Sequence, residues 1–121
     1  MEVPAREPFV RTIRLVTGDA AARAGFTIDQ IEDVRLVVTE LCFAILVPRA
    51  TVLGLHVRIR PARITVTGTV DAPHQRAPDL DAVANFVIDS ICDRCTITAG
   101  EKSMSFAFET HARSFETHAG P

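Results

Sequence analysis

Glu40 is the only acidic residue in a long apolar stretch, VRLVVTELCFAIL, at positions 34–46. If the stretch is helical, the side chains three and four positions away are all apolar: Leu36, Val37, Phe43 and Ala44. No cation on the helix is therefore placed to pair with the carboxylate. A carboxylate on an apolar surface costs free energy unless something satisfies or uses it. Two interpretations stay open: a general base of a site, or a surface acid satisfied by water or by Arg58 or Arg60.

Cys92 and Cys95 form a C-x-x-C motif, CDRC, a pattern also found in zinc and redox sites. A structural zinc site needs four ligands, usually two such pairs or one pair with histidines. The chain has three cysteines and no second pair, and its four histidines show no ligand spacing relative to the motif: His56, His74, His111 and His118. We interpret the two cysteines as unconnected residues at a helix end, and an odd number of cysteines suits reduced thiols in the cytosol.

Composition and charge favour one globular domain without a bulk preference for nucleic acid or membranes. The chain has 121 residues, 47% of them hydrophobic, with 13 Lys and Arg against 15 Asp and Glu. The start, MEVPAREPFV, lacks a signal pattern, and Glu40 interrupts the longest apolar run well short of the roughly 20 residues of a membrane span. We expect a cytoplasmic domain at 1–121, with a core at about 7–110 and a flexible tail at 111–121. The repeated FETHA near the end is interpreted as part of a frayed terminus.

Hydrophobic periodicity predicts two helices in the first part of the chain. The first, at about 8–24, has core-facing residues at helical spacing: Phe9, Ile13, Val16 and Ala20. Gly25 suits the position just past its end. The second helix, at about 28–47, begins with a capping box of Thr27 and Gln30. Because it is apolar nearly all round, it should be central and well covered.

Alternating residues then predict a β-hairpin. Apolar positions alternate with polar ones at 53–59 and again at 64–70, and the short sequence PAR connects the two strands. The following segment, 71–78, contains two prolines and is expected to form a loop.

A third helix and a second hairpin complete the predicted fold. The helix spans about 80–92 with Asp79 as its cap, and the strands CTITA and SMSFAFE are joined around Gly100. The order helix, helix, strand, strand, helix, strand, strand predicts an α+β two-layer sandwich with the helices on one face of the sheet.

The stretch from Glu7 to Ala44 is similar to the start of the bacterial anti-sigma factor serine kinases, members of the GHKL (histidine-kinase-like) ATPase superfamily. The shared features are Arg14 midway along the first helix, the GF-x-x-x-x-IED junction and the segment VVTEL. The order of the later elements also matches, so the resemblance covers about 7–110. It implies a Bergerat-type ATPase fold and a regulator of transcription, such as a stress response, in the cytoplasm. The implied partners are a sigma factor and an anti-anti-sigma (STAS-type) protein, with a possible homodimer and no direct contact with nucleic acid.

The resemblance assigns chemistry to Glu40, but the metal ligand expected beside it is missing. In the family, the glutamate that matches Glu40 is a general base. An asparagine one turn later holds the magnesium ion that bridges the ATP phosphates, and this position is Ala44 here. A methyl side chain offers no oxygen to a cation that requires oxygen ligands. Glu40 is therefore interpreted as a vestigial base.

Two further nucleotide-binding motifs of the family are also altered. The Asp-x-Gly-x-Gly box corresponds to GTVDAPHQRAP, where Asp71 matches only with a shift of one residue and no glycine follows before Gly100. The glycine-rich entry to the next helix is replaced by DLDAVANF, in which Asp79 and Asp81 would repel phosphate. With three boxes altered, we expect no bound cofactor.

Three functions are compatible with these observations. The first is an anti-sigma factor, or related regulator, that acts by protein binding without kinase activity. The second is an active serine/threonine kinase that phosphorylates an anti-anti-sigma factor with ATP and magnesium, using Glu40 as base. The third is an unrelated structural or interaction module, with redox sensing through Cys92 and Cys95 as one possibility.

Arg14 and Arg11 are the candidate partner-binding residues. The resemblance places Arg14 at the helix-one arginine with which the family's kinases grip their sigma factor. Arg11 lies three residues earlier, on the same side of the predicted helix. A guanidinium binds a carboxylate through two parallel hydrogen bonds, and arginine is common among interface hot spots.

Overall fold

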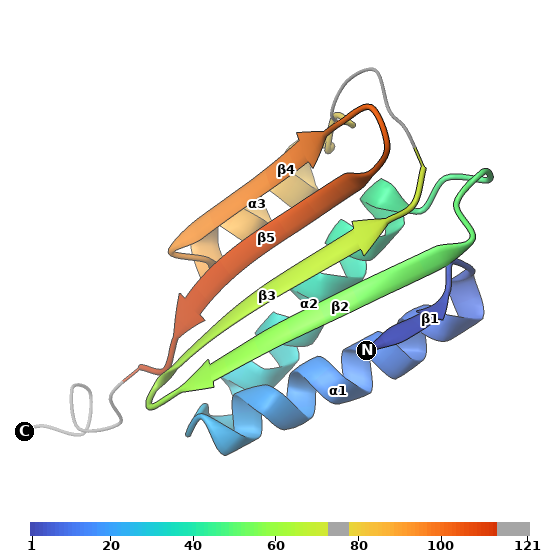
Figure 1. Cartoon of the computed structure of the whole chain (residues 1–121). Coiled ribbons are helices and arrows are strands. Elements are labelled where there is room, and N and C mark those ends of the chain that lie inside the picture. Colours follow the sequence, from blue (N-terminus) through green and yellow to red (C-terminus); the bar gives the residue numbers. More distant parts are fainter. Residues whose placement is uncertain (73–77, 114–121) are drawn as a thin grey trace, which may run out of the picture.

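A five-stranded antiparallel sheet carries three helices on one face in the computed structural model, which describes residues 1–72 and 78–113 (Figure 1). The strand order is β1-β2-β3-β5-β4. The strands are β1 (Glu2–Pro4), β2 (Val52–Arg60), β3 (Arg63–Val70), β4 (Arg94–Ala99) and β5 (Met104–His111). The helices are α1 (Val10–Arg23), α2 (Ile28–Ile45) and α3 (Ala82–Ile91), and a 3-10 turn, η1 (Glu7–Phe9), leads into α1. The predicted α+β two-layer arrangement is confirmed.

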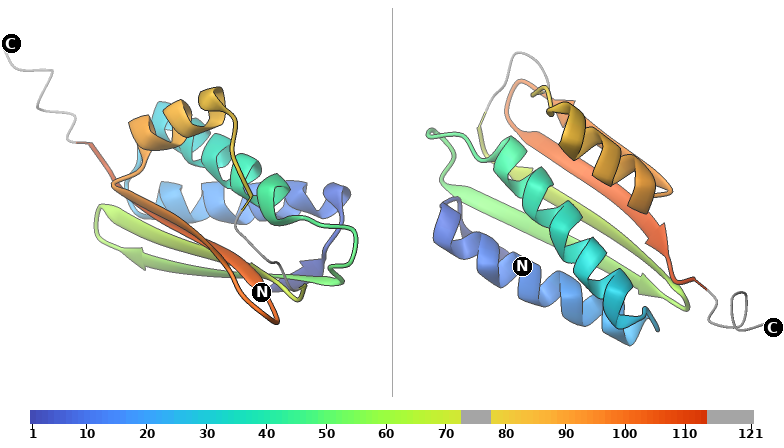
Figure 2. Two further views of the ribbon diagram at one scale, coloured as in Figure 1. Left: turned by 90° about the horizontal axis from the view of Figure 1, so that it is seen from above. Right: turned by 180° about the vertical axis from the view of Figure 1, so that it is seen from behind.

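The three helices form one layer, with α2 between α1 and α3 (Figure 2). The largest fully buried side chains between this layer and the sheet include Leu41 and Ile45 of α2 and Phe106 and Phe108 of β5. Within the described residues, no helix is both long and apolar enough to cross a membrane.

The buried stripe of α1 differs from the predicted one. It runs through Val10, Ile13, Thr17 and Ala21, with intervals of three or four residues. Ile13 and Ala20 are buried as expected, but Phe9 and Val16 are each 37% exposed. Both flanks of α1 carry apolar residues, so periodicity alone did not decide which flank packs on the sheet. Gly25 follows the helix with φ of 89°, as its predicted position requires.

The start of α2 is confirmed, but its predicted coverage is wrong. The Gln30 amide donates to Thr27 Oγ1 over 3.2 Å, and the Thr27 amide donates to Gln30 Oε1 over 3.2 Å. These bonds form the capping box. Leu36 and Phe43, however, are 44% and 46% exposed. A single helix layer has nothing above it, so the outer face of α2 remains open to solvent.

The first hairpin forms as predicted. Its turn is hydrogen-bonded to the C-cap residue of α1 and to the residue that follows β5. Ala62, in the turn between β2 and β3, has φ of 62°. Its amide donates to Ala24 O over 3.1 Å, and its carbonyl accepts from the Ala112 amide over 2.7 Å. These two hydrogen bonds hold alanine in a conformation that usually favours glycine.

The cap of α3 is Asp81, not Asp79 as predicted. The Asp81 carboxylate accepts from the Ala84 amide over 2.7 Å, so the helix begins at Ala82. Asp79 and Asp81 are both residue types that cap helices well, so the sequence did not distinguish them. The cap is Asp81 because the helix begins at the next residue, Ala82. Residues 73–77 of the predicted loop lie outside the described residues.

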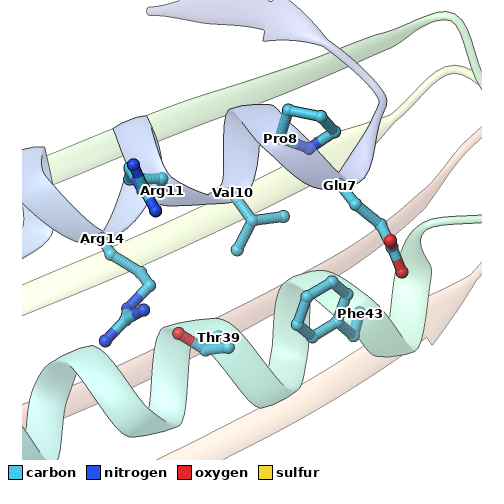
Figure 3. A pocket seen from close by; sticks show the side chains of 7 residues that line it. All are labelled: Glu7, Pro8, Val10, Arg11, Arg14, Thr39 and Phe43. Carbon is cyan, nitrogen blue, oxygen red and sulfur yellow. The ribbon is translucent and has the colours of Figure 1, made fainter.

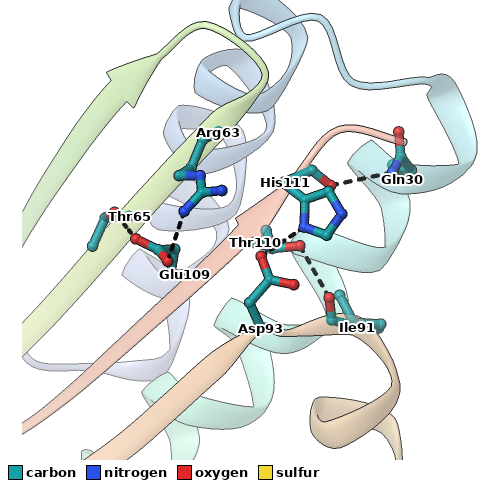
Figure 4. A network of polar contacts seen from close by, with 8 residues as sticks. All are labelled: Gln30, Arg63, Thr65, Ile91, Asp93, Glu109, Thr110 and His111. Carbon is teal, nitrogen blue, oxygen red and sulfur yellow. Dashed lines mark hydrogen bonds and ion pairs between the residues drawn. The ribbon is translucent and has the colours of Figure 1, made fainter. Parts of the chain in front are cut away.

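The core extends beyond 7–110 at both ends. β1 pairs with β2, with Val3 buried opposite Leu53. At the other end, residues 108–111 of the first FETHA copy belong to β5 and are not frayed. Thr110 Oγ1 donates to Ile91 O over 3.0 Å, and His111 Nδ1 lies 2.7 Å from Asp93 Oδ2 (Figure 4). The second copy lies outside the described residues.

Candidate partner-binding site

A groove of about 550 Å³ opens between α1 and α2 on the outer side of the helix layer (Figure 3). Its lining residues come from η1, α1 and α2: Glu7, Pro8, Val10, Arg11, Arg14, Thr39 and Phe43. Burial of Ile13 sets the rotation of α1, which leaves Arg11 and Arg14 exposed. Thr39 and Phe43 lie one turn apart on α2.

The groove combines two unpaired cations and the Glu7 carboxylate with an apolar surface. Across residues 1–72 and 78–113, neither Arg11 nor Arg14 forms an ion pair or a side-chain hydrogen bond. The Thr39 hydroxyl donates to Arg35 O over 2.7 Å, so this hydroxyl is already satisfied inside α2. Phe43 supplies a half-exposed aromatic ring. These features are suited to a protein segment that presents carboxylates beside apolar side chains.

The contact between α1 and α2 depends on Gly18, one turn beyond Arg14. A Cβ atom at Gly18 would lie 2.9 Å from Arg35 Nε. Arg35 Nη1 donates to Glu32 Oε1 over 3.0 Å, whereas its Nε is buried without a partner among the described residues. This close packing was not predicted from the sequence. A glycine within a helix was the available signal, because it marks a position where another chain segment approaches closely.

Glu40 lies outside the groove that Arg11 and Arg14 line. It follows Thr39 and is therefore rotated by about 100° around α2. Its side chain is half-buried, and in the part of the chain that the structure describes it has no hydrogen bond or ion pair. The suggested pairing with Arg58 or Arg60 is not formed. The predicted catalytic residue and the predicted partner-binding residues therefore do not line the same groove.

The Asp71 carboxylate is hydrogen-bonded to the residues at the beginning of β2. It accepts from the Thr51 amide over 2.7 Å and from the Val52 amide over 3.0 Å, and it also accepts from the Thr51 hydroxyl. Because these hydrogen bonds favour the ionised form, they lower the pKa of Asp71 to about 2. Asp71 matches the family's adenine-binding aspartate only with a shift of one residue. Its carboxylate is instead hydrogen-bonded to backbone amides of this chain.

Neither cysteine of the CDRC motif is disulfide-bonded. Cys92 follows the end of α3, and Cys95 lies in β4. Burial raises the pKa of the Cys92 thiol to about 12, so this thiol is protonated at neutral pH. Within the described ranges, no cluster of three or more His, Cys, Asp or Glu side chains is arranged to hold a metal ion.

One part of the chain is similar in sequence to known proteins. No family model matches the chain. The chain resembles RsbW kinases in part. Over 42 residues it is 45% identical to the serine-protein kinase RsbW of Bacillus subtilis, and equally to that of Halalkalibacterium halodurans. The RsbW of Bacillus velezensis is 40% identical over the same length. Each match spans 35% of this chain and only 26% of the kinase.

Proposed function

We propose that this chain is an anti-sigma factor, or a related regulator, that binds a sigma factor or an anti-anti-sigma protein without kinase activity. The groove between α1 and α2 carries the proposal, because its two unpaired arginines and exposed Phe43 suit protein binding. The similarity to part of RsbW supports the choice of partner class. The fold is proposed to be a histidine-kinase-like ATPase fold that serves as a binding scaffold.

Three features support the absence of kinase chemistry. Ala44 offers no oxygen where the family's metal ligand is expected. Asp71 is hydrogen-bonded to the backbone at the start of β2. At the start of α3, Asp81 occupies the Ala84 amide that a phosphate group would otherwise approach. Each position is thus either chemically unsuited to nucleotide binding or used within the fold.

Replacement of Arg14 tests the binding function. With a purified sigma factor from the same cell, Arg14→Ala should weaken binding by about 2 kcal/mol, or roughly thirty-fold, and leave the Tm nearly unchanged. Arg58→Ala, on the exposed part of β2, is the matched control and should bind like the unmodified chain. Failure of both sigma and anti-anti-sigma proteins to bind the unmodified chain would refute the function. Normal binding by Arg14→Ala would refute only the docking site.

An ATP-dependent serine/threonine kinase is the second candidate. It is favoured by the unpartnered Glu40 carboxylate, which remains available as a base, and by the kinase activity in the RsbW name. We expect calorimetry to detect no binding of ATP with magnesium at sub-millimolar concentration. Tight, magnesium-dependent binding would instead establish the kinase. In that case Glu40→Gln should abolish phosphate transfer to a captured anti-anti-sigma protein while the fold is retained.

A further inference from the structure

Strand β4 forms an edge of the sheet that no other described strand covers. In the strand order β1-β2-β3-β5-β4, it pairs with β5 alone among the described residues. The opposite edge is β1, which has three residues and contains Pro4, a residue that cannot donate a backbone hydrogen bond. β4 has six residues, RCTITA, without a proline. Apart from Arg94, it therefore lacks the residues by which proteins usually protect an edge strand from further pairing.

Alternate residues of β4 direct their backbone groups away from β5. In the turn between the two strands, the Gly100 amide donates to Ser103 O over 2.9 Å. Hydrogen-bonded pairs alternate with non-hydrogen-bonded pairs along an antiparallel ladder. Counting back along the register from this turn, the backbone groups of Thr96 and Thr98 bond to β5. The backbone groups of the residues between and beside them point to the open edge: Cys95, Ile97 and Ala99.

A pocket of about 290 Å³ lies beside this edge, between α3 and β4. In Figure 1, α3 lies behind β4 and β5. Cys95 and Ile97 line the pocket from β4, and Leu80 and the buried Ile88 complete its apolar part. A strand added to β4 continues the alternation of side chains between the two faces of the sheet. Its inward-facing side chains would therefore lie at this pocket.

Two carboxylates at the pocket give it a preference for a cation. Asp79 and Asp89 both line it and are both exposed. Within residues 1–72 and 78–113, neither carboxylate has an ion pair or a side-chain hydrogen bond. None of the described residues that line the pocket is Lys or Arg. An arginine from outside matches both parts of the pocket, because its stem packs on apolar side chains while its guanidinium binds carboxylate.

We infer that β4 is the docking edge for an extended, arginine-containing segment of another protein, which adds a strand to the sheet. The backbone of this segment pairs with Cys95, Ile97 and Ala99. Its arginine faces inward and binds Asp79 and Asp89. The open backbone groups require an extended chain, and the unpaired carboxylates favour a cationic one. The pocket shares no lining residue with the groove between α1 and α2, so this contact is additional to the proposed function.

A synthetic peptide tests this edge without a natural partner. The probe is a labelled heptapeptide with threonine at every other position, arginine at the centre and valine at the two remaining positions. The arginine and both valines then share one face of the extended peptide. Fluorescence anisotropy should show saturable binding to the full chain. A control peptide with glutamate in place of the arginine should bind at least about tenfold more weakly.

Charge variants of the chain test the pocket. Asp79→Lys/Asp89→Lys should weaken binding of the arginine peptide at least about tenfold. Glu2→Lys/Asp29→Lys makes the same charge change at exposed positions elsewhere and should bind the peptide like the unmodified chain. All four side chains are exposed, and circular dichroism checks that both variants remain folded. Equal weakening by the two variants would show attraction to net charge alone and would overturn the inference.

Amide hydrogen exchange by NMR distinguishes strand addition from other modes of binding. With the arginine peptide bound, the amides of Cys95, Ile97 and Ala99 should exchange at least about tenfold more slowly. Those of Thr96 and Thr98, which already bond to β5, should change little.

Three results would overturn the inference: no saturable binding at about 1 mM peptide, equal binding of both peptides, or binding without this alternating protection. Protection of the same amides in the unmodified chain alone, rising with its concentration, would assign the edge to a second copy and would also overturn it. Because no sigma factor or anti-anti-sigma protein is present, these outcomes are independent of the proposed function.

Discussion

Asp71 stabilises the fold through the ionised form of its carboxylate. It accepts hydrogen bonds from backbone and side-chain groups that lie about 20 residues earlier in the chain, which ties the end of β3 to the start of β2. The bonds therefore help to fix the register of the first hairpin in addition to lowering the pKa.

Asp71→Asn should make stability less dependent on pH in the acidic range. The folded pKa of about 2 lies below the ordinary value of 3.8, so the charged carboxylate stabilises the folded state above about pH 4. That contribution is lost as pH falls from about 4 to about 2. Urea unfolding at several pH values should show the unmodified chain more stable than the variant above this window, with the difference shrinking inside it. A constant difference across the window would contradict the assignment.

Thr51→Val is a suitable companion to this experiment. It removes the hydroxyl donor but keeps both amide donors to Asp71, so the acid-dependent loss should be reduced and still present.

At the scale of elements, the packing of β3 against β5 depends on a glycine. A Cβ atom at Gly68 would lie 2.4 Å from Phe106 Cε2, and Phe106 is almost fully buried. The ring therefore occupies the space that a side chain on β3 would need. Sequence periodicity does not predict this contact with Phe106, because the alternating pattern shows only that Gly68 faces inward.

Gly68→Ala should lower the free energy of unfolding by about 1 to 3 kcal/mol, the usual effect of overpacking a dense core. Gly54→Ala is a matched strand control, because the nearest atom to its Cβ position is Thr69 O at 3.8 Å. Denaturant unfolding of both variants measures the difference. Equal stability of the two variants would show that Phe106 can move aside without cost.

At the scale of the whole molecule, one core connects the helix layer to the sheet. The buried cluster includes Val3 of β1, Leu41 of α2, Ile88 of α3 and Phe106 of β5. All three helices and strands β1, β2, β3 and β5 contribute to this core, and residues of β4 pack against it. Among the described residues, the helices and strands therefore share one core and should unfold together.

Leu41→Ala should destabilise the whole fold by about 2 to 5 kcal/mol, because it leaves a cavity at a fully buried position. Helix content by circular dichroism and the Phe106 and Phe108 ring signals by NMR should change in one shared transition. The chain has no Trp or Tyr, so phenylalanine is the aromatic reporter of the sheet. Leu36→Ala, at a 44% exposed position of the same helix, should cost much less. Separate helix and sheet transitions would contradict a single core.

The sequence by itself determined the types of most elements, because these depend on neighbouring residues. The capping box at Thr27, the glycine after α1 and the alternation in β2 and β3 are local signals, and all appear in the structure. β1 was missed because three residues are too few to show a period.

Only the tertiary structure decided which faces and partners these elements acquire. Phe43 is exposed and lines the same groove as Arg11 and Arg14, whereas Glu40 does not line it. Asp71 likewise acquired partners about 20 residues away. The physical reason is that hydrogen bonding over three or four residues, or alternation over two, is encoded locally. Contacts between distant segments depend instead on how the helices pack on the sheet, and the sequence pattern does not report that packing.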